Sequence, residues 1–275
     1  MNLDKLIELA LEEDIFQGDV TTDNLGISDK EAIAVLVAKE NGVLAGIKVA
    51  KKVFQQVDNK TKFTTNHSDG YLLKKGDIIA NIEGFASSIL KAERIALNFM
   101  QRMSGIATTT RFYIEKISHT SCKLLDTRKT TPLLRNLEKY SVKVGGGFNH
   151  RFGLYDMIML KENHIRVAGS ISKAVAQVKS NTNSYKIEVE VTNLQELEEA
   201  VNCNIDRVML DNMSLADIKK AVEKFSDIVE LEASGNVTQK TIKKIAETGV
   251  HYISSGAITH SYKSLDISLL FKEKV

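Results

Sequence analysis

The pattern of apolar and polar residues divides the chain at about residue 108. In the first part, residues 2–14 and 87–103 carry apolar side chains at helical spacing, and we expect the second helix to continue to residue 118. Two β-hairpins are predicted between these helices. The first pairs residues 33–38 with 43–47 about Gly42, and the second pairs 71–73 with 78–82 about the turn at 74–77. These elements predict a mixed α/β domain over residues 1–108.

The second part alternates strands and helices at a regular interval. The predicted strands are residues 123–126, 156–160, 186–191, 206–211, 228–234 and 250–255. Asn193, Ser214 and Thr238 are predicted to cap helices, and Gly249 to end the last of these. Because the later strands end about 22 residues apart, the length of one βα unit, we expect a parallel sheet. An open (β/α) barrel of six to seven strands over residues 109–275 is predicted, with the last helix free to pack back on the first domain.

Charged residues alternate along several of these strands. Buried parallel strands are usually apolar on both faces, so charges of both signs on one face predict a barrel interior lined by ion pairs. Such an interior needs a functional reason, because burying charge is costly. The alternative is a two-layer sheet with one wet face. The residues concerned are Lys186, Glu188 and Glu190, then Arg207, Met209 and Asp211, then Glu230, Glu232 and Ser234.

Composition excludes several classes of protein. Lys+Arg 37 against Asp+Glu 35 gives a net charge of +2, which offers no support for a nucleic-acid binder. No apolar run approaches the roughly 20 residues of a membrane span, and the acidic, amphipathic first 15 residues do not form a signal peptide. Cys122 and Cys203 lie far apart and lack metal-ligand spacing, which predicts a cytoplasmic location.

Positive charge is concentrated in one segment, residues 126–166. Arginine and lysine side chains surround the Gly145–Gly147 run there and alternate with apolar residues, which favours a site for a strongly anionic small molecule. A solvated basic loop is the alternative. The basic residues are Arg128, Lys129, Arg135, Lys139, Lys143, His150, Arg151, Lys161, His164 and Arg166.

Polar residues stand at the predicted carboxyl ends of the strands, where parallel barrels carry their active sites. Two small-residue turns, Ser234-Gly235-Asn236 and Ser255-Gly256-Ala257, can present backbone N–H groups to a phosphate, aided by the helices that follow. Glu190 and Asp211 can hold Mg²⁺ or sugar hydroxyls. They are equally suited to pair with Lys161 and Lys186.

A polar stripe on the long helix, formed by Arg94, Asn98 and Arg102, has two interpretations. Residues four apart share a helix face, so the stripe is either a solvated surface or a border of the basic site.

A series of short segments then resembles the motifs of one family, in the same order and over almost the whole chain. These segments are EDIFQGDVTT (13–22), ERIALNFMQRMSGIAT (93–108), DTRKTTPLLRNLEKYSV (126–142), GGGFNHRFGL (145–154), LKENHI (160–165), EVEV (188–191), VMLDN (208–212), LEASGN (231–236) and SSGAITHS (254–261). The chain resembles quinolinate phosphoribosyltransferase, the decarboxylating nicotinate-nucleotide pyrophosphorylase of NAD synthesis. Leu133 is a departure, since many relatives have glycine after the proline.

The resemblance implies an N-terminal α/β sandwich domain and an open barrel, assembled as a homodimer or a hexamer. It implies the substrates quinolinate and 5-phosphoribosyl 1-pyrophosphate, with Mg²⁺ as cofactor. The carboxylates of quinolinate would meet Thr127, Arg128, His150, Arg151 and Lys161, with Arg102 supplied by the neighbouring subunit. Lys129 and Lys161 would approach the pyrophosphate, Glu190 and Asp211 the ribose and Mg²⁺, and the turns Ser234, Gly235, Asn236 and Ser255, Gly256, Ala257 the 5′-phosphate.

Other functions stay open on the residues alone. One is a barrel lyase or aldolase that uses Lys161 as a Schiff-base nucleophile. Another is a non-catalytic protein that binds anions or nucleic acid. A third is a paralogue of the same family that acts on another base.

Overall fold

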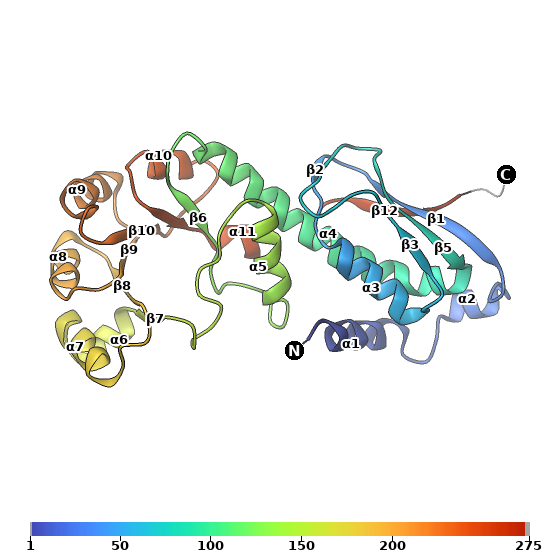
Figure 1. Ribbon diagram of the computed structural model, residues 1–275, viewed down its shortest axis with the longest axis horizontal. Helices are drawn as coiled ribbons and strands as arrows, with labels where there is room; N and C mark the ends of the chain where they lie inside the picture. The colour runs from blue at the N-terminus through green and yellow to red at the C-terminus, as the bar shows by residue number, and fades with distance from the viewer. Residues whose placement is uncertain (1, 273–275) are drawn as a thin grey trace. The chain divides into compact units, whose positions relative to one another are not determined.

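The computed structural model describes residues 2–272 and contains two compact units (Figure 1). The first unit comprises the chain up to Arg111, the segment Thr131–Gly146 and the chain from Tyr262 onward. The second comprises Phe112–Thr130 and Gly147–Ser261. The first change of unit lies close to the boundary expected at residue 108, but the chain also returns twice to the first unit.

The first unit is built on a four-stranded antiparallel sheet with the order β12-β1-β5-β3. Its strands are β1 (Glu31–Ala38), β3 (Lys62–Thr64), β5 (Ile78–Phe85) and β12 (Ile267–Phe271), and a separate pair is formed by β2 (Gly42–Val43) and β4 (Leu72–Leu73). Its helices are α1 (Leu3–Ile15), α2 (Val20–Asn24), α3 (Ile47–Val57), α5 (Arg135–Val144) and α4 (Ala86–Ile117) as far as Arg111. The apolar faces of α1, α3 and α4 join one side of the sheet in a single core.

The two predicted hairpins are wrong. β1 pairs with β5 and β12, and β2 pairs with β4, so the strands on either side of each turn are not partners. The predicted strand at 43–47 ends at Val43, and α3 begins at Ile47. Gly42 is required for close packing, because a Cβ there would lie 2.4 Å from Leu265 and 2.7 Å from Thr108. Gly42 therefore marks a close contact between elements and not the turn of a hairpin.

The last element of the chain is also different from the prediction. The sequence analysis expects a final helix that can pack back on the first domain, whereas the structure has the strand β12, which pairs antiparallel with β1. Ile267 and Leu269 are buried and alternate with more exposed side chains, which is the two-residue period of a strand.

The second unit contains a six-stranded parallel sheet with the order β6-β11-β10-β9-β8-β7, which confirms the open parallel barrel (Figure 1). Its strands are β6 (Lys123–Leu125), β7 (Ile158–Leu160), β8 (Ile187–Val191), β9 (Arg207–Asp211), β10 (Glu230–Ser234) and β11 (Tyr252–Ser254). Its helices are α6 (Glu162–Ala168), α7 (Ile171–Asn181), α8 (Leu194–Asn202), α9 (Leu215–Phe225), α10 (Ile242–Ala246) and α11 (Ala257–His260).

Two of the predicted helix caps are confirmed. The side chains of Asn193 and Ser214 accept hydrogen bonds from backbone N–H groups three residues later, at 2.9 and 3.1 Å. Thr238 does not cap a helix, because α10 begins only at Ile242 after a turn in which the Thr238 hydroxyl accepts the N–H of Thr241.

The strands of the second unit have two different faces. Val189, Val208, Leu210 and Leu231 are buried on the apolar face. Glu188, Arg207, Glu230 and Glu232 lie on the other face, where Arg207 pairs with both Glu230 and Glu232. The predicted interior of compensating ion pairs is therefore confirmed.

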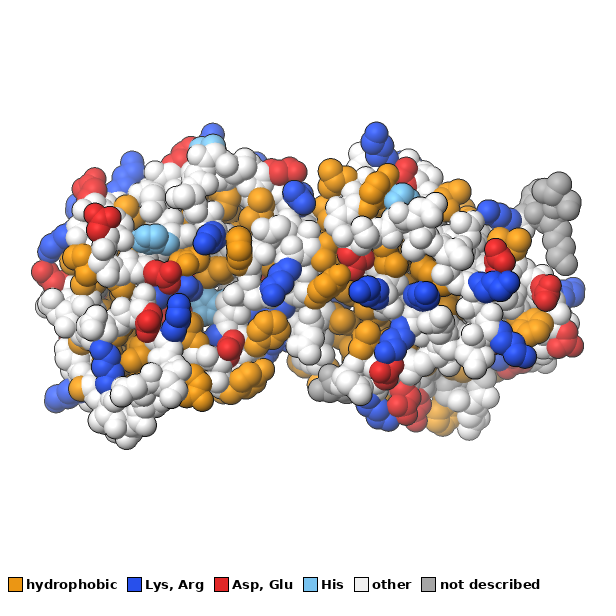
Figure 2. Space-filling view, in the orientation of Figure 1, with side chains coloured by type: hydrophobic (Ala, Val, Ile, Leu, Met, Phe, Trp, Pro, Cys, Tyr) orange, Lys and Arg blue, Asp and Glu red, His pale blue; other side chains and the backbone are white. Residues whose placement is uncertain are grey.

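The outer surface has no single charged pole on the face drawn in Figure 2, where basic and acidic side chains are interspersed over each unit. Across the described residues, no helix combines the length and the apolar character needed to cross a membrane.

Gly105 lies within the unbroken helix α4, and a substitution at this position tests the packing of the first unit. A Cβ on Gly105 would lie 2.2 Å from the carbonyl oxygen of Lys263 and 2.9 Å from the Cα of Ser264. Gly105→Ala should therefore destabilise the protein, because overpacking costs about 1–3 kcal/mol and exceeds the gain in helix propensity of about 1 kcal/mol. Thermal melts would show a fall of a few degrees. Asn98→Ala, at an exposed position of the same helix, is the control and should not lower the melting temperature.

Candidate active site

The carboxyl edge of the parallel sheet borders a cavity of about 820 Å³ within the second unit, which is in the size range of ligand sites. All the residues that the family resemblance assigns to the site line it except Arg102. They are Thr127, Arg128, Lys129, His150, Arg151, Lys161, Glu190, Asp211, Ser234, Gly235, Asn236, Ser255, Gly256 and Ala257. The cavity therefore brings together side chains from the ends of all six strands. In contrast, Arg135, Lys139, Lys143, His164 and Arg166 of the basic segment are not among its lining residues.

A second hollow of about 790 Å³ lies in the first unit, over β1, β3 and β5. Its charged side chains are acidic and basic in similar number, among them Glu31, Lys60, Lys62 and Glu83. It has no convergent set of one charge, so the cavity of the second unit is the candidate active site.

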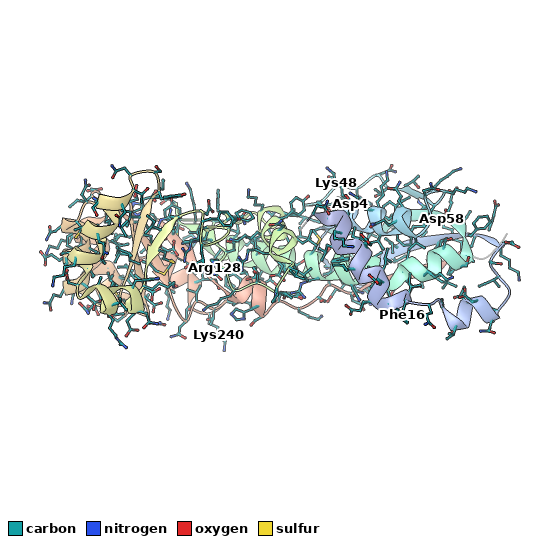
Figure 3. All side chains as sticks on the ribbon, turned by 90° about the horizontal axis from the view of Figure 1, so that it is seen from below. Asp4, Phe16, Lys48, Asp58, Arg128 and Lys240 are labelled. Carbon is teal, nitrogen blue, oxygen red and sulfur yellow. The ribbon has the colours of Figure 1, made fainter. Side chains whose placement is uncertain are left out.

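Two arginines give the cavity a concentrated positive charge. Arg128, labelled in Figure 3, lies in the segment that follows β6, and Arg151 is anchored by a hydrogen bond of 3.0 Å from its Nη1 to the carbonyl oxygen of Met157. Burial lowers the pKa of Arg151, and the neighbouring charge of Arg128 lowers it further. Two like charges held this close favour the binding of an anion between them.

The loop that carries Lys129 is fixed by short hydrogen bonds. The backbone N–H of Lys129 donates to the Thr127 hydroxyl at 3.0 Å, and the Thr259 hydroxyl donates to the Lys129 carbonyl at 2.8 Å. The lysine stem crosses Gly256, where a Cβ would lie 2.8 Å from the Cδ of Lys129. The small residue after β11 thus allows the lysine to reach over this turn.

The acidic side of the cavity is formed by Glu190 and Asp211 at the ends of β8 and β9. Glu190 forms a salt bridge of 2.7 Å with Lys161. Burial raises the pKa of Asp211, and the charge of Glu190 raises it further, so the two carboxylates lie close enough to repel each other. Two carboxylates suit Mg²⁺, which usually keeps several waters and takes other ligands from phosphate groups.

The turn after β10 is shaped by contacts with Asn212. Gly235 has φ +88°, and a Cβ on it would lie 2.1 Å from the side-chain oxygen of Asn212. Asn212 also donates to Asp211 at 2.9 Å and accepts from the Asn236 side chain at 3.0 Å. The helix that follows this turn, expected after Thr238, begins only at Ile242 and so does not start at the turn itself. The turn after β11, in contrast, leads straight into α11 at Ala257.

His150 lines the cavity, and its ring is buried against carboxylates of the barrel interior. Its Nε2 lies 3.0 Å from Oε2 of Glu188 and 3.5 Å from Oε2 of Glu232. Burial lowers the pKa of His150, but the hydrogen bonds and charges of Glu188 and Glu232 outweigh it and raise that pKa to about 9. Burial and the charge of Glu232 also raise the pKa of Glu188.

Two contacts of the His150 ring bear on its protonation in opposite ways. Nδ1 lies 2.8 Å from the backbone N of Arg151, whose N–H a neutral ring would accept. The buried carboxylates favour the imidazolium form instead. We favour the cation, because Nε2 faces two buried carboxylates and a small turn of the half-buried Arg151 peptide can relieve the Nδ1 contact.

The ligand atoms of His150, Glu188 and Glu232 lie within 4.8 Å of one another, which is close enough to hold a metal ion. However, a protonated His150 ring offers no lone pair at Nε2, and Glu232 already pairs with Arg207 at 3.1 Å. We therefore assign no metal to this group.

Arg102 lies in the first unit and has partners there. Its Nε donates to Oε1 of the buried Glu138 at 3.0 Å, and its guanidinium stacks on the ring of Tyr262, 5.0 Å from the ring centroid. Its predicted role in the active site of a neighbouring subunit stays a prediction.

Sequence analysis missed four residues that shape this site: Asn212, Glu188, Glu232 and His260. Asn212 and His260 line the cavity and belong to the motifs VMLDN and SSGAITHS. The alternation along β8 and β10 indicated that Glu188 and Glu232 face inward. Their convergence on His150 could not be predicted, because it depends on the course of the loop between α5 and β7.

The fold and the cavity together define an α/β-barrel protein with a cavity of mixed charge, rich in basic residues, at the carboxyl edge of its strands. Comparison with known proteins identifies its family. Residues 19–104 match the model of the quinolinate phosphoribosyl transferase N-terminal domain, and residues 106–270 match that of the C-terminal domain. The chain belongs to the quinolinate phosphoribosyltransferase family.

Individual relatives agree over nearly the full chain. The chain is 46% identical to the chloroplastic nicotinate-nucleotide pyrophosphorylase [carboxylating] of Oryza sativa subsp. japonica, over 98% of this chain and 77% of that protein. It is 41% identical to the probable nicotinate-nucleotide pyrophosphorylase [carboxylating] of Bacillus subtilis, over 98% and 93%. The crystal structure of NadC from Streptococcus pyogenes aligns with a TM-score of 0.94 at 43% identity, over 98% of this chain and 97% of that one.

The buried carboxylates beside His150 predict that stability depends on pH. The pKa of about 9 in the folded protein exceeds the ordinary value of about 6.5 in the unfolded chain. The resulting stabilisation is complete below about pH 6.5 and is lost as the pH rises to about 9. The free energy of unfolding, measured with denaturant, should fall across this window.

His150→Gln should show a smaller fall between these pH values. His119→Gln is the control, because His119 is exposed and pairs only with Glu247, at 3.1 Å. Equal pH dependence in the wild type and in His150→Gln would contradict the proposed protonation.

Proposed function

We propose that the protein transfers the phosphoribosyl group of 5-phosphoribosyl 1-pyrophosphate to quinolinate with loss of CO₂. The products are nicotinate mononucleotide and pyrophosphate, and the pathway is NAD biosynthesis. One observation carries the proposal: a single cavity combines cations for a dianion, carboxylates for ribose or metal, and small-residue turns for a phosphate. The names of the relatives, nicotinate-nucleotide pyrophosphorylase and quinolinate phosphoribosyltransferase, support the same reaction.

Quinolinate carries two adjacent carboxylates, which suit the cationic side of the cavity. Arg128 and Arg151 would each present a planar guanidinium to them, and Thr127, His150 and Lys161 would complete the contacts. Arginine forks bind carboxylates bidentately, so this arrangement fixes the orientation of the ring as well as its charge.

The phosphoribosyl pyrophosphate would lie along the remaining side. Glu190 and Asp211 would accept hydrogen bonds from the ribose hydroxyls or hold Mg²⁺, and the turns at 234–236 and 255–257 would bind the 5′-phosphate. Lys129 and Lys161 would approach the pyrophosphate. When bound, Mg²⁺ would offset the negative charge that develops on the leaving group.

The mechanism follows from this placement. The ring nitrogen attacks C1 of the ribose while the bond from C1 to pyrophosphate breaks, so positive charge develops on the ribose. The alkylated ring nitrogen is cationic, so loss of the neighbouring carboxylate as CO₂ leaves a carbanion that is stabilised as an ylide and takes up a proton. The residues of the cavity supply position and preorganised charge, and no covalent intermediate with the protein is required.

The Schiff-base alternative is disfavoured by the salt bridge of Lys161. Its Nζ lies 2.7 Å from Glu190, so the amine is held by a carboxylate rather than placed to attack a carbonyl carbon. Borohydride trapping with carbonyl substrates would show no covalent adduct.

The decisive experiment is an assay with quinolinate, phosphoribosyl pyrophosphate and Mg²⁺, with detection of nicotinate mononucleotide and CO₂. A parallel assay with nicotinate in place of quinolinate tests whether both carboxylates are needed and detects a paralogue with another base. Omission of Mg²⁺ tests the cofactor, which stays a prediction, as does the cytoplasmic location. Failure to form nicotinate mononucleotide would overturn the proposal.

Arg128→Ala and Lys161→Ala should each abolish turnover with little effect on folding. Loss of one charge-assisted contact to a carboxylate should cost about 2–4 kcal/mol in the transition state. Steady-state kinetics beside thermal melts would measure both effects. Arg166→Ala is the matched control, because Arg166 is basic and exposed and pairs only with Glu162 in the same helix. Near wild-type turnover in either cavity variant would remove that residue from the site.

A homodimer in which Arg102 completes the neighbour's site is part of the same proposal, and association into a hexamer is compatible with it. Supporting it are the polar stripe with Arg94 and Asn98 and the fixed orientation of the guanidinium against Glu138. A two-fold dimer would place this surface at the partner's cavity once per subunit.

Co-expression of Arg102→Ala with Arg128→Ala tests this arrangement. Each homodimer should be inactive, whereas a mixed dimer has one site with both changes and one with neither. Random pairing makes about half of the dimers mixed, so activity should recover to about a quarter of wild type. Inactive mixed dimers, verified by differential tagging, would show that Arg102 acts within its own chain or has another role.

A further inference from the structure

We propose that Glu188 and Glu232 are positioning residues for His150: they orient its ring at the cavity wall and keep it as a cation that faces an anionic substrate. This inference deepens the proposed function and rests on it. It gives the buried charges of the barrel interior a role at the active site.

The geometry shows that the ring is held from two strands at once. Glu188 projects from β8 and Glu232 from β10, and both approach the same atom of His150, Nε2, at 3.0 and 3.5 Å. Both carboxylates are fully buried, and His150 is 7% exposed. Two anchors on rigid strands restrict rotation of the ring far more than one contact from a loop would.

The charge balance of the interior requires a second cation beside Arg207. Arg207, on β9 between the two carboxylate strands, pairs with Glu232 at 3.1 Å and with the more exposed Glu230 at 3.0 Å. One guanidinium cannot compensate two fully buried carboxylates and Glu230 as well. Protonated His150 supplies the missing charge, and a buried carboxylate without compensation would be costly.

Other charged groups around His150 come from each neighbouring element. Asp126, after β6, accepts the backbone N–H of His150 at 2.9 Å, and Arg151 follows in the same loop. Arg128 also lines the cavity, close enough for its charge to act on Arg151. Asp126 is thus a further carboxylate, but it binds the backbone of His150 rather than its ring. Arg128 and Arg151 are two cations whose charge an anionic ligand would neutralise.

The buried carboxylates therefore have two effects on the cavity. The carboxylates keep positive charge on a ring that lines the substrate cavity, and the paired charges of Arg207 and the ring offset their repulsion of the substrate. Removing one of them should weaken quinolinate binding. The affinity for phosphoribosyl pyrophosphate should not change, because the residues proposed to bind it, Glu190 and Asp211, lie elsewhere, at the ends of β8 and β9.

The test combines a spectroscopic and a kinetic measurement on the full-length protein. NMR of protein labelled at the histidine Cε1 would follow the titration of His150, with its signal assigned by its loss in His150→Gln. The wild-type midpoint should lie near pH 9, and Glu232→Gln should lower it by at least one pH unit towards the ordinary value of about 6.5. The same variant should raise KM for quinolinate by about tenfold near pH 8, with KM for phosphoribosyl pyrophosphate unchanged.

Glu230→Gln is the matched control. Glu230 lies on the same strand and shares Arg207 as a partner with Glu232, but its other contact is the Tyr252 hydroxyl at 2.9 Å. It should leave the His150 midpoint and both KM values unchanged. If Glu232→Gln does not fold, Glu188→Gln and the wild-type titration serve in its place.

The outcomes separate this inference from the proposed function, because the titration requires no substrate. A wild-type midpoint near 6.5, or an unchanged midpoint in Glu232→Gln, overturns the inference even if turnover is normal. An elevated midpoint that falls in Glu232→Gln supports it, and absence of quinolinate turnover would then count against the proposed function alone. Equal effects of Glu230→Gln and Glu232→Gln would show a general structural role and also overturn it.

Discussion

The compensation of charge inside the parallel sheet is the constraint on which the site depends. Glu188 and Glu232 are fully buried on inward-facing positions, where apolar side chains would be less costly. Arg207, between them on β9, and His150, from the loop between α5 and β7, compensate the charge of this interior. The opposite faces of the same strands are apolar and pack in the usual way, so the fold is stabilised on one face and the cavity is organised on the other.

Local patterns predicted the second unit well and the first unit less well, for a physical reason. All six parallel strands were predicted, because each contains a short apolar or alternating run, and the helices after β8 and β9 have recognisable caps at Asn193 and Ser214. The antiparallel sheet joins β1 with β12 from opposite ends of the chain. A turn pattern about Gly42 carries no information on such a distant partner, so both hairpins were assigned the wrong pairing.

The candidate site shows the same limit. The polar residues at the strand ends could be predicted to share one edge, because parallel strands all end on the same side. Their partners could not be predicted. The contact of Asn212 with Gly235 needs positive φ values at both residues, and the hydrogen bond of Arg102 to Glu138 joins two helices of the first unit. Such contacts depend on tertiary packing rather than on spacing along the sequence.

The order of the strands explains how one cavity can hold two different polyanions. Along the sheet β6-β11-β10-β9-β8-β7, the following segments supply cations, two small-residue turns, two carboxylates, and again a cation, Lys161. Positive charge thus stands at the two unpaired ends of the sheet, and the acidic pair is separated from Arg128 by the turns. Burial and the charge of Arg128 lower the pKa of Arg151, and burial and the charge of Glu190 raise the pKa of Asp211. These repulsions cost stability in the folded protein, and bound ligands would relieve them. The apolar faces of the strands contribute the stability that offsets this cost and keeps the site preorganised for binding.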